Sequence, residues 1–205
     1  MKIDYQLYLV TEESVPVEEL LSIVEEAIQG GVTTVQLREK KNSGRVFYEK
    51  AVKLKALTEK YQVPLFINDR VDIALAVRAD GIHIGQQDLP LHEVKKIVPS
   101  SMLVGVSCGT VEEALAAEKG GADYIGVGAV FPTKSKKNAK VLEDGLLKKI
   151  TRAVSIPVVA IGGINLENVS FIRNHDIAGI AVVSEIMKAE EPHEAARLLR
   201  DKLRG

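Results

Sequence analysis

Short apolar runs alternate with longer amphipathic segments along the whole chain. The apolar runs are rich in β-branched residues and occupy positions 5–10, 33–37, 64–68, 81–85, 103–107, 124–128, 157–161 and 177–183. A strand with one face in water alternates apolar and polar side chains, whereas a parallel strand buried on both faces is apolar throughout. The pattern therefore predicts eight short parallel strands.

The segments between these runs carry apolar residues at helical spacing. Residues 17–31 end in a pair of glycines, which commonly terminate a helix. Residues 110–122 begin with Thr110, a favourable N-cap, and Glu113 follows three positions later. Residues 191–204 predict a closing helix. The chain is thus expected to alternate strand and helix from one end to the other.

This alternation favours a single-domain (β/α)8 barrel, the TIM barrel, over residues 1–205. Eight strand–helix units fit within the 205 residues, and no linker or shift of composition interrupts them. The alternative is an open, doubly wound sheet, which favours a glycine fingerprint after the first strand. The residues there read LVTEES, which is no such fingerprint. In a barrel the active site lies at the carboxyl ends of the strands, so polar residues at those ends become candidates.

Composition excludes several classes of function. The formal net charge is -1, and only 4% of residues are aromatic, so neither the basic excess nor the stacking surface of a nucleic-acid binder is present. A single cysteine, Cys108, rules out a disulfide framework or a cysteine-rich zinc site within one chain. No apolar run is long enough for a membrane span, and the N-terminal residues resemble neither a signal nor a transit peptide. We therefore expect a cytoplasmic protein without nucleic-acid or membrane partners, and a homo-oligomer stays open.

Glycine and hydroxyl residues follow the last two predicted strands. Gly162 and Gly163 come after the strand at 157–161, Val183 ends the run at 177–183, and Ser184 follows it. Glycines let a backbone approach an anion closely, and a short helix starting near Ser184 would direct N–H groups at it. Many barrels hold a phosphate at this position. A glycine pair that only serves a tight turn is the alternative, but the two features together favour a phosphate site.

Two carboxylates follow neighbouring strands, Asp69 after residues 64–68 and Asp88 after residues 81–85. Mg²⁺ typically binds one or two carboxylates together with phosphate oxygens, so the two aspartates could share one ion. Alternatively, Asp69 pairs with Arg70 and Asp88 is a loop residue or a cap. Spacing alone leaves both readings open.

Cations at the same end of the barrel favour the metal interpretation. Arg38 and Lys40 follow the second strand, and Lys136 lies in the lysine-rich segment 131–140 after the sixth. A lysine-rich loop is more often a solvated surface. This one is also long, contains Pro132 and hydroxyl residues, and follows a strand at the active end, as expected of a lid over a polyanion. A Mg²⁺–diphosphate site facing a separate monophosphate site would suit an enzyme that joins two phosphorylated molecules and releases diphosphate.

Two further residues with reactive side chains are weaker candidates for catalysis. His83 lies between two isoleucines, where a packed, hydrogen-bonded histidine is more common than a general base. Cys108 follows Ser107 at a strand end with no partner base identifiable, so a small packed thiol is the expectation. The sequence predicts no protein nucleophile.

Longer motifs resemble the thiamine phosphate synthase family, in the same order and over nearly the whole chain. They occupy 35–40 (VQLREK), 67–90 (INDRVDIALAVRADGIHIGQQDLP), 105–107 (GVS), 121–137 (GADYIGVGAVFPTKSKK), 156–164 (IPVVAIGGI) and 181–186 (AVVSEI). The resemblance implies that a hydroxymethylpyrimidine diphosphate is joined to a thiazole phosphate, with diphosphate leaving first. It implies two small-molecule substrates and one cofactor, Mg²⁺.

The resemblance also implies roles for individual residues. Contacts to the pyrimidine diphosphate are expected from Gln36, Arg38, Lys40, Asn68, Ser107 and Lys136. Arg38, Ser107 and Lys136 would assist its departure, and Asp69 and Asp88 would hold Mg²⁺. Contacts to the thiazole phosphate are expected from Thr133, Ser135, Gly163, Val183 and Ser184.

Two departures from the family pattern are small. Ser135 stands where threonine is usual and keeps the hydroxyl, and GVSCGT lacks the histidine that commonly follows the serine. The alternatives are a thiazole tautomerase-like isomerase and a non-catalytic regulator on the same fold. The presence of Gln36, Asn68, Asp69 and Asp88 favours the synthase.

Overall fold

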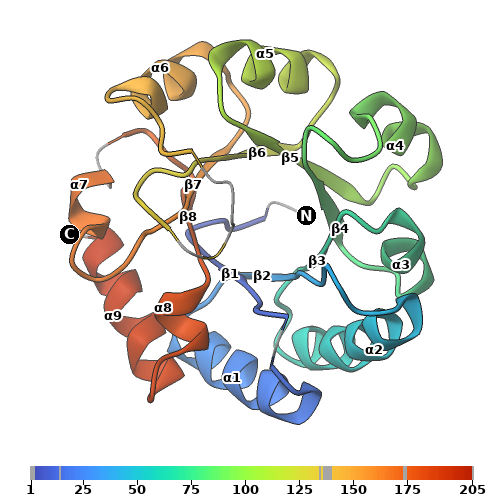
Figure 1. Ribbon diagram of the computed structural model, residues 1–205. Coiled ribbons are helices and arrows are strands. Elements are labelled where there is room, and N and C mark those ends of the chain that lie inside the picture. Colours follow the sequence, from blue (N-terminus) through green and yellow to red (C-terminus); the bar gives the residue numbers. More distant parts are fainter. Residues whose placement is uncertain (1–2, 14, 134, 136–139, 173–174, 205) are drawn as a thin grey trace.

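The computed structural model describes residues 3–13, 15–133, 135, 140–172 and 175–204, and they form one closed barrel of eight parallel strands in sequence order (Figure 1). The strands are β1 (Leu7–Val10), β2 (Thr34–Leu37), β3 (Leu65–Asn68), β4 (Gly81–Ile84), β5 (Leu103–Cys108), β6 (Tyr124–Val127), β7 (Val158–Ile161) and β8 (Gly179–Val182). Each overlaps one of the predicted runs. The predicted (β/α)8 barrel is confirmed.

Helices surround the barrel (Figure 1). They are α1 (Val17–Gly30), α2 (Gly44–Lys60), α3 (Val71–Ala76), α4 (Leu91–Ile97), α5 (Val111–Lys119), α6 (Leu146–Ala153), α7 (Val169–Ile172), α8 (Ser184–Met187) and α9 (Pro192–Arg204). None of these helices is long and apolar enough to cross a membrane, within the part of the chain that the structure describes.

Local sequence accounts for the helix ends. α1 stops at Gly31, which adopts a left-handed conformation with φ of 114° and donates its N–H to the last turn. α5 starts at Thr110, whose hydroxyl accepts a hydrogen bond from the N–H of Glu113. The apolar faces of these helices pack on the outer surface of the barrel, where the main hydrophobic core lies.

The barrel interior is filled by aromatic rings. Tyr8, Phe66 and Tyr124 lie within 6.0 Å of one another, measured between ring centroids, and all are buried. Glycines in the neighbouring strands make room for them. A Cβ at Gly81 would lie 2.1 Å from the Phe66 ring, and one at Gly105 would lie 2.2 Å from the Tyr124 ring. These buried rings thus build a layer beneath the carboxyl ends of the strands.

Candidate active site

Four adjacent strands present polar side chains to the barrel interior, just above the aromatic layer. Strand register pairs Gln36 with Phe66 and Asn68 with His83, and Ser107 lies on the next strand. Inward-facing positions recur every second residue, so Asn68 follows Phe66 on the same face of β3. The sequence-predicted residues Gln36, Asn68 and Ser107 are therefore gathered around one mouth.

A chain of hydrogen bonds crosses the barrel interior beneath this mouth. Nε2 of Gln36 donates to the hydroxyl of Tyr8 at 2.9 Å, and the hydroxyls of Tyr8 and Tyr124 lie 2.9 Å apart. The Tyr124 hydroxyl lies 2.8 Å from Nδ1 of His83, and Nε2 of His83 lies 2.9 Å from Oγ of Ser107. Burial raises the pKa of both tyrosines, so their hydroxyls stay neutral. Two predicted substrate contacts, Gln36 and Ser107, are thereby connected.

Sequence reasoning missed Tyr8 and Tyr124. Only their position in the sequence could have identified them, since each is a polar-tipped residue at an inward-facing site of an otherwise apolar strand. His83 is buried and hydrogen-bonded, in agreement with the packed role expected for it.

Asn68 carries an unsatisfied group. Its Nδ2 is buried and has no hydrogen-bond partner among the described residues. Leaving a buried donor unpaired costs about 1–3 kcal/mol, so such a group is uncommon in a folded protein, and this one is free to donate to an acceptor at the mouth. Asn68 lies next to Asp69, directly at the exit of β3.

The two predicted metal ligands lie against each other. Burial raises the pKa of the Asp69 carboxyl; the ammonium of Lys40, which forms an ion pair with it, acts to lower that pKa, and the adjacent Asp88 carboxyl acts to raise it. Oδ2 of Asp88 accepts a hydrogen bond of 2.8 Å from the N–H of Gly85. The exits of β2, β3 and β4 thus bring one ammonium and two carboxylates together.

The backbone of Asp69 is unusual as well. Its φ of 61° lies in the left-handed region, which non-glycine residues seldom adopt, and its N–H donates to the carbonyl of His83 at 2.8 Å. Backbone strain of this kind concentrates at functional sites. The alternative pairing of Asp69 with Arg70 is wrong: Arg70 binds Asp72, with Nε 2.8 Å from Oδ1, because both side chains point outward at the start of α3.

The β7–β8 side of the mouth is built from backbone. Gly162 and Gly163 have φ of 101° and 69°, and the N–H of Phe131 donates to the carbonyl of Gly162 at 2.9 Å. A Cβ on Gly163 would lie 2.4 Å from the carbonyl oxygen of Pro132. The segment after β6, yellow in Figure 1, therefore packs directly against the β7 exit. Only glycine fits there.

The remaining predicted residues are placed as follows. Thr133 lies in the same segment, and its hydroxyl accepts a hydrogen bond of 3.2 Å from the N–H of Ser135. Val183 immediately precedes α8, and Ser184 is its first residue, as predicted for a helix start. Lys136 lies outside the described residues. Across the described part of the chain, no cluster of three or more His, Cys, Asp or Glu side chains is suited to a metal, so Asp69 and Asp88 are a two-carboxylate set.

The fold and the strand-end residues define the chain as a (β/α)8-barrel protein with a charged site at one side of its mouth and a glycine-rich loop at the other. The family model described as thiamine monophosphate synthase matches residues 7–186. A thiamine-phosphate synthase of Ruminiclostridium cellulolyticum is 54% identical over 97% of this chain and 95% of its own length. A second, from Methanobrevibacter smithii, is 48% identical over 96% of this chain and 94% of its own length.

Among solved structures, thiamine phosphate pyrophosphorylase from Pyrococcus furiosus superimposes with a TM-score of 0.89 at 42% identity, covering 98% of this chain and 96% of that one. The chain belongs to the thiamine monophosphate synthase family. The resemblance read from the sequence motifs is confirmed.

Proposed function

We propose that this protein joins hydroxymethylpyrimidine diphosphate to hydroxyethylthiazole phosphate, giving thiamine phosphate and diphosphate. The observation that carries the proposal is the contact of Lys40, Asp69 and Asp88 at three adjacent strand exits, a charged group suited to a metal-bound diphosphate. Family membership and the printed names of relatives that match over the full chain support the same reaction. The protein would accordingly be a Mg²⁺-dependent transferase.

Asp69 and Asp88 are the residues that would hold Mg²⁺. Two carboxylates in contact repel each other unless a proton or cation compensates them. Burial is the main reason that the pKa of Asp69 is raised, and repulsion by Asp88 adds to it. Hard carboxylate oxygens suit Mg²⁺, which completes its octahedral shell with water and phosphate oxygens. Mg²⁺ bound there would neutralise charge on the leaving diphosphate.

The pyrimidine diphosphate would be received by side chains of the β2–β5 side and of the loop after β6: Gln36, Arg38, Lys40, Asn68, Ser107 and Lys136. The planar guanidinium of Arg38 is suited to bind phosphate oxygens through two hydrogen bonds. The unpartnered Nδ2 of Asn68 supplies a further donor for an oxygen of the ligand. Arg38, Ser107 and Lys136 would assist the departure of diphosphate by stabilising the charge that collects on it.

The thiazole phosphate would be bound on the opposite side of the mouth by Thr133, Ser135, Gly163, Val183 and Ser184. The close packing of the β7 exit on the preceding segment brings Gly163 next to Pro132, the residue before Thr133. Backbone N–H groups and hydroxyls at this site would donate to the phosphate oxygens.

The reaction we propose needs no nucleophile from the protein. The bond between the pyrimidine methylene carbon and the diphosphate oxygen breaks, and its electron pair leaves with the diphosphate. The thiazole nitrogen then donates its lone pair to the methylene carbocation and forms the new C–N bond. The side chains hold both substrates in line and stabilise the leaving group. In agreement, the nearby Cys108 is buried, and burial, with the negative charge of Glu113, raises its pKa to about 12.

The experiment that tests the proposal measures thiamine phosphate formation from the two substrates, with and without Mg²⁺, in the wild type and in Asp69→Ala. We expect metal-dependent product formation that the substitution abolishes. Full turnover by the variant without Mg²⁺ would refute the metal assignment. No product from the wild type would favour the isomerase or the regulator instead. The cytoplasmic location stays part of the proposal, and fractionation of the source cells tests it.

A further inference from the structure

A buried ion pair lies behind the residues that present Arg38 and Lys40. The ammonium of Lys50, on α2, is 2.9 Å from Oε1 of Glu39, the residue between the two cations. The Glu39 side chain is fully buried and that of Lys50 is 9% exposed. Removing two charges from water offsets most of their mutual attraction, so a buried pair stabilises a fold little by itself. Its partners indicate what it does instead.

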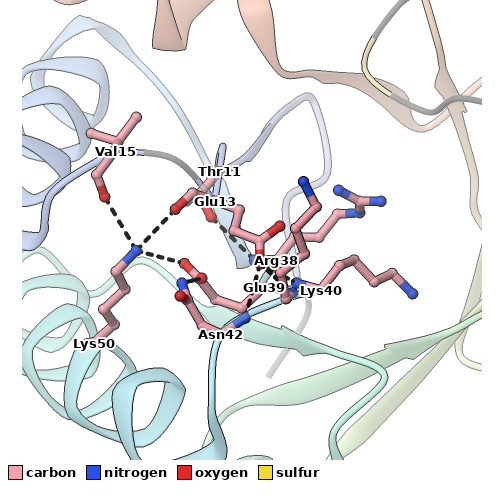
Figure 2. A network of polar contacts seen from close by, with 9 residues as sticks. Thr11, Glu13, Val15, Arg38, Glu39, Lys40, Asn42 and Lys50 are labelled. Carbon is pink, nitrogen blue, oxygen red and sulfur yellow. Dashed lines mark hydrogen bonds and ion pairs between the residues drawn. The ribbon is translucent and has the colours of Figure 1, made fainter.

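The Lys50 ammonium connects two loops. Its three donors reach three acceptors: Oε1 of Glu39, the carbonyl of Glu13 at 3.2 Å and the carbonyl of Val15 at 3.1 Å. The second oxygen of Glu39 accepts a hydrogen bond from the side-chain amide of Asn42. Figure 2 shows these contacts converging from both loops. The loop after β1 and the loop after β2 are therefore fixed to each other and to α2.

The Glu13 carboxylate makes a second connection between the same loops. Its Oε1 accepts hydrogen bonds from three consecutive backbone N–H groups, those of Lys40 at 3.0 Å, Lys41, and Asn42 at 3.1 Å. Successive N–H groups that converge in this way form a concave anion-binding nest. Burial acts to raise the pKa of Glu13, but these N–H groups outweigh it and hold the pKa below its usual value. The carboxylate therefore stays charged.

Thr11, also from the loop after β1, completes the set. Its hydroxyl oxygen accepts a hydrogen bond of 3.1 Å from the N–H of Arg38. The backbone is thus held at residues 38, 40, 41 and 42, and residue 39 is held through its side chain. In Figure 2 the Arg38 guanidinium lies on the opposite side of the network from Lys50. Lys40 extends to Asp69 at the mouth.

We propose that Glu39, Lys50 and Glu13 are positioning residues, which hold Arg38 and Lys40 in the arrangement that receives the diphosphate. The proposal rests on the function proposed above. A cation held in place before the ligand arrives loses little conformational freedom on binding, and it stabilises a leaving group without having to reorganise. Interactions that orient a binding residue are needed wherever geometry must be kept within a fraction of an ångström.

The first test compares Lys50→Met with Lys55→Met in steady-state kinetics. Lys55 is a matched control, because it lies on the same helix and its ammonium is 2.8 Å from Oδ2 of Asp80, just before β4 at the other end of the barrel. We expect Lys50→Met to lower kcat/KM for the pyrimidine diphosphate by about 10- to 100-fold, the order of loss caused by small misplacements. The KM for the thiazole phosphate should stay within about twofold in both variants. Equal losses in the two variants, or equal rises of both KM values, would overturn the proposal.

Milder substitutions keep the test valid where Lys50→Met does not fold. Thr11→Val removes the acceptor for the Arg38 N–H at nearly constant volume, and we expect it to raise the KM for the pyrimidine diphosphate selectively. Glu13→Gln keeps an acceptor oxygen for the N–H groups of residues 40–42, whereas Glu13→Ala removes it. The glutamine variant should therefore retain most of the activity that the alanine variant loses. Wild-type kinetics in Thr11→Val and Glu13→Ala would overturn the proposal.

Binding of inorganic pyrophosphate with Mg²⁺, followed by titration calorimetry, separates this inference from the proposed function. We expect the wild type and Lys55→Met to bind pyrophosphate alike and Lys50→Met to bind it at least about tenfold more weakly, a loss of roughly 1.4 kcal/mol. If that holds while no thiamine phosphate is formed, the proposed function fails and the positioning role stands. Equal affinity in Lys50→Met and the wild type, or no binding by the wild type, would overturn the positioning role.

Discussion

The two sides of the barrel mouth are built by different means. On the β2–β5 side, side chains carry the site: Lys40 pairs with Asp69, and Asn68 holds an unpaired donor. On the β7–β8 side, backbone conformation carries it: Gly162 and Gly163 adopt left-handed angles and contact the segment after β6. A charge substitution should therefore disable the first side, and an added Cβ should disable the second.

The comparison follows from the ligands we propose. A diphosphate with its metal carries a concentrated charge, which fixed formal charges of both signs are suited to hold. A monophosphate can be bound by hydroxyls and N–H groups if the backbone comes close enough, and glycine allows that approach. Single substitutions should disable one side at a time, and we expect the largest effect at Asp69 and the smallest at Cys108.

Asp69→Asn should disable only the charged β2–β5 side of the mouth. Asparagine matches the shape of aspartate and tolerates the left-handed φ of 61°, so the substitution removes charge without added backbone strain. We expect kcat to fall by about 10²–10³-fold, the usual loss for one group that stabilises a transition state electrostatically, with the KM for the thiazole phosphate unchanged. Initial rates at saturating Mg²⁺ measure this.

Asp72→Asn is the matched control for Asp69→Asn, because it removes a neighbouring carboxylate that pairs with Arg70 at the surface. It should keep the activity of the wild type. A similar loss in both variants would mean that charge near α3 matters generally and that Asp69 has no special role.

Gly163→Ala should disable only the β7–β8 side of the mouth, which is built from backbone. The new Cβ would lie 2.4 Å from the carbonyl oxygen of Pro132, so the β7 exit or the segment after β6 must move. We expect the KM for the thiazole phosphate to rise about tenfold or more, with the KM for the pyrimidine diphosphate nearly unchanged.

Gly145→Ala separates crowding from backbone strain in that experiment. Gly145 also has a left-handed φ, 72°, but a Cβ there meets nothing within 4 Å. Both variants should lose about 1–2 kcal/mol of unfolding free energy from the left-handed alanine, as measured by denaturant titration. Only Gly163→Ala should impair thiazole phosphate binding, and an equal rise of KM in both would show that strain alone explains it.

Tyr124→Phe should have a smaller effect, since it acts beneath the mouth. It removes the hydroxyl that hydrogen-bonds both Tyr8 and Nδ1 of His83, at a cost of about 1–3 kcal/mol in unfolding free energy. Because Gln36 and Ser107 lie at the two ends of this series of hydrogen bonds, kcat/KM for the pyrimidine diphosphate should fall several-fold. Tyr5→Phe is the control, since the Tyr5 hydroxyl has no hydrogen-bond partner within the described ranges. Identical thermal midpoints for the two variants would contradict the prediction.

The fold was predictable because its signals are local. Each strand is a short apolar run, and the helix ends depend on a few neighbouring residues such as Thr110 and Gly31. The predicted site residues were found by the same logic, since the carboxyl ends of parallel strands meet at one face. Asn68, Asp69 and Ser107 could therefore be assigned to the mouth without knowing which side chains touch.

The contacts within the site were not predictable, because they depend on barrel closure. Tyr8 and Tyr124 are 116 positions apart and meet only through the register of the closed barrel. Nor does spacing tell whether Asp69 binds Arg70 or Lys40; the left-handed backbone at Asp69 and the outward start of α3 decide it. The pairing of Glu39 with Lys50 likewise needs the packing of α2 against the loop after β2.

Cys108 should show the smallest effect, although it directly follows Ser107 on β5. Side chains alternate across a strand, so Ser107 faces the mouth while Cys108 packs in the outer hydrophobic core at 3% exposure. Cys108→Ala should therefore keep kcat and both KM values within about twofold and lower the unfolding free energy by about 1 kcal/mol. With its pKa raised to about 12, the thiol should react with a disulfide reagent at neutral pH only when the protein unfolds. Rapid labelling of Cys108 in the folded protein, with loss of turnover, would contradict this prediction. It would show that the outer face of β5 also contributes to the charged side of the mouth.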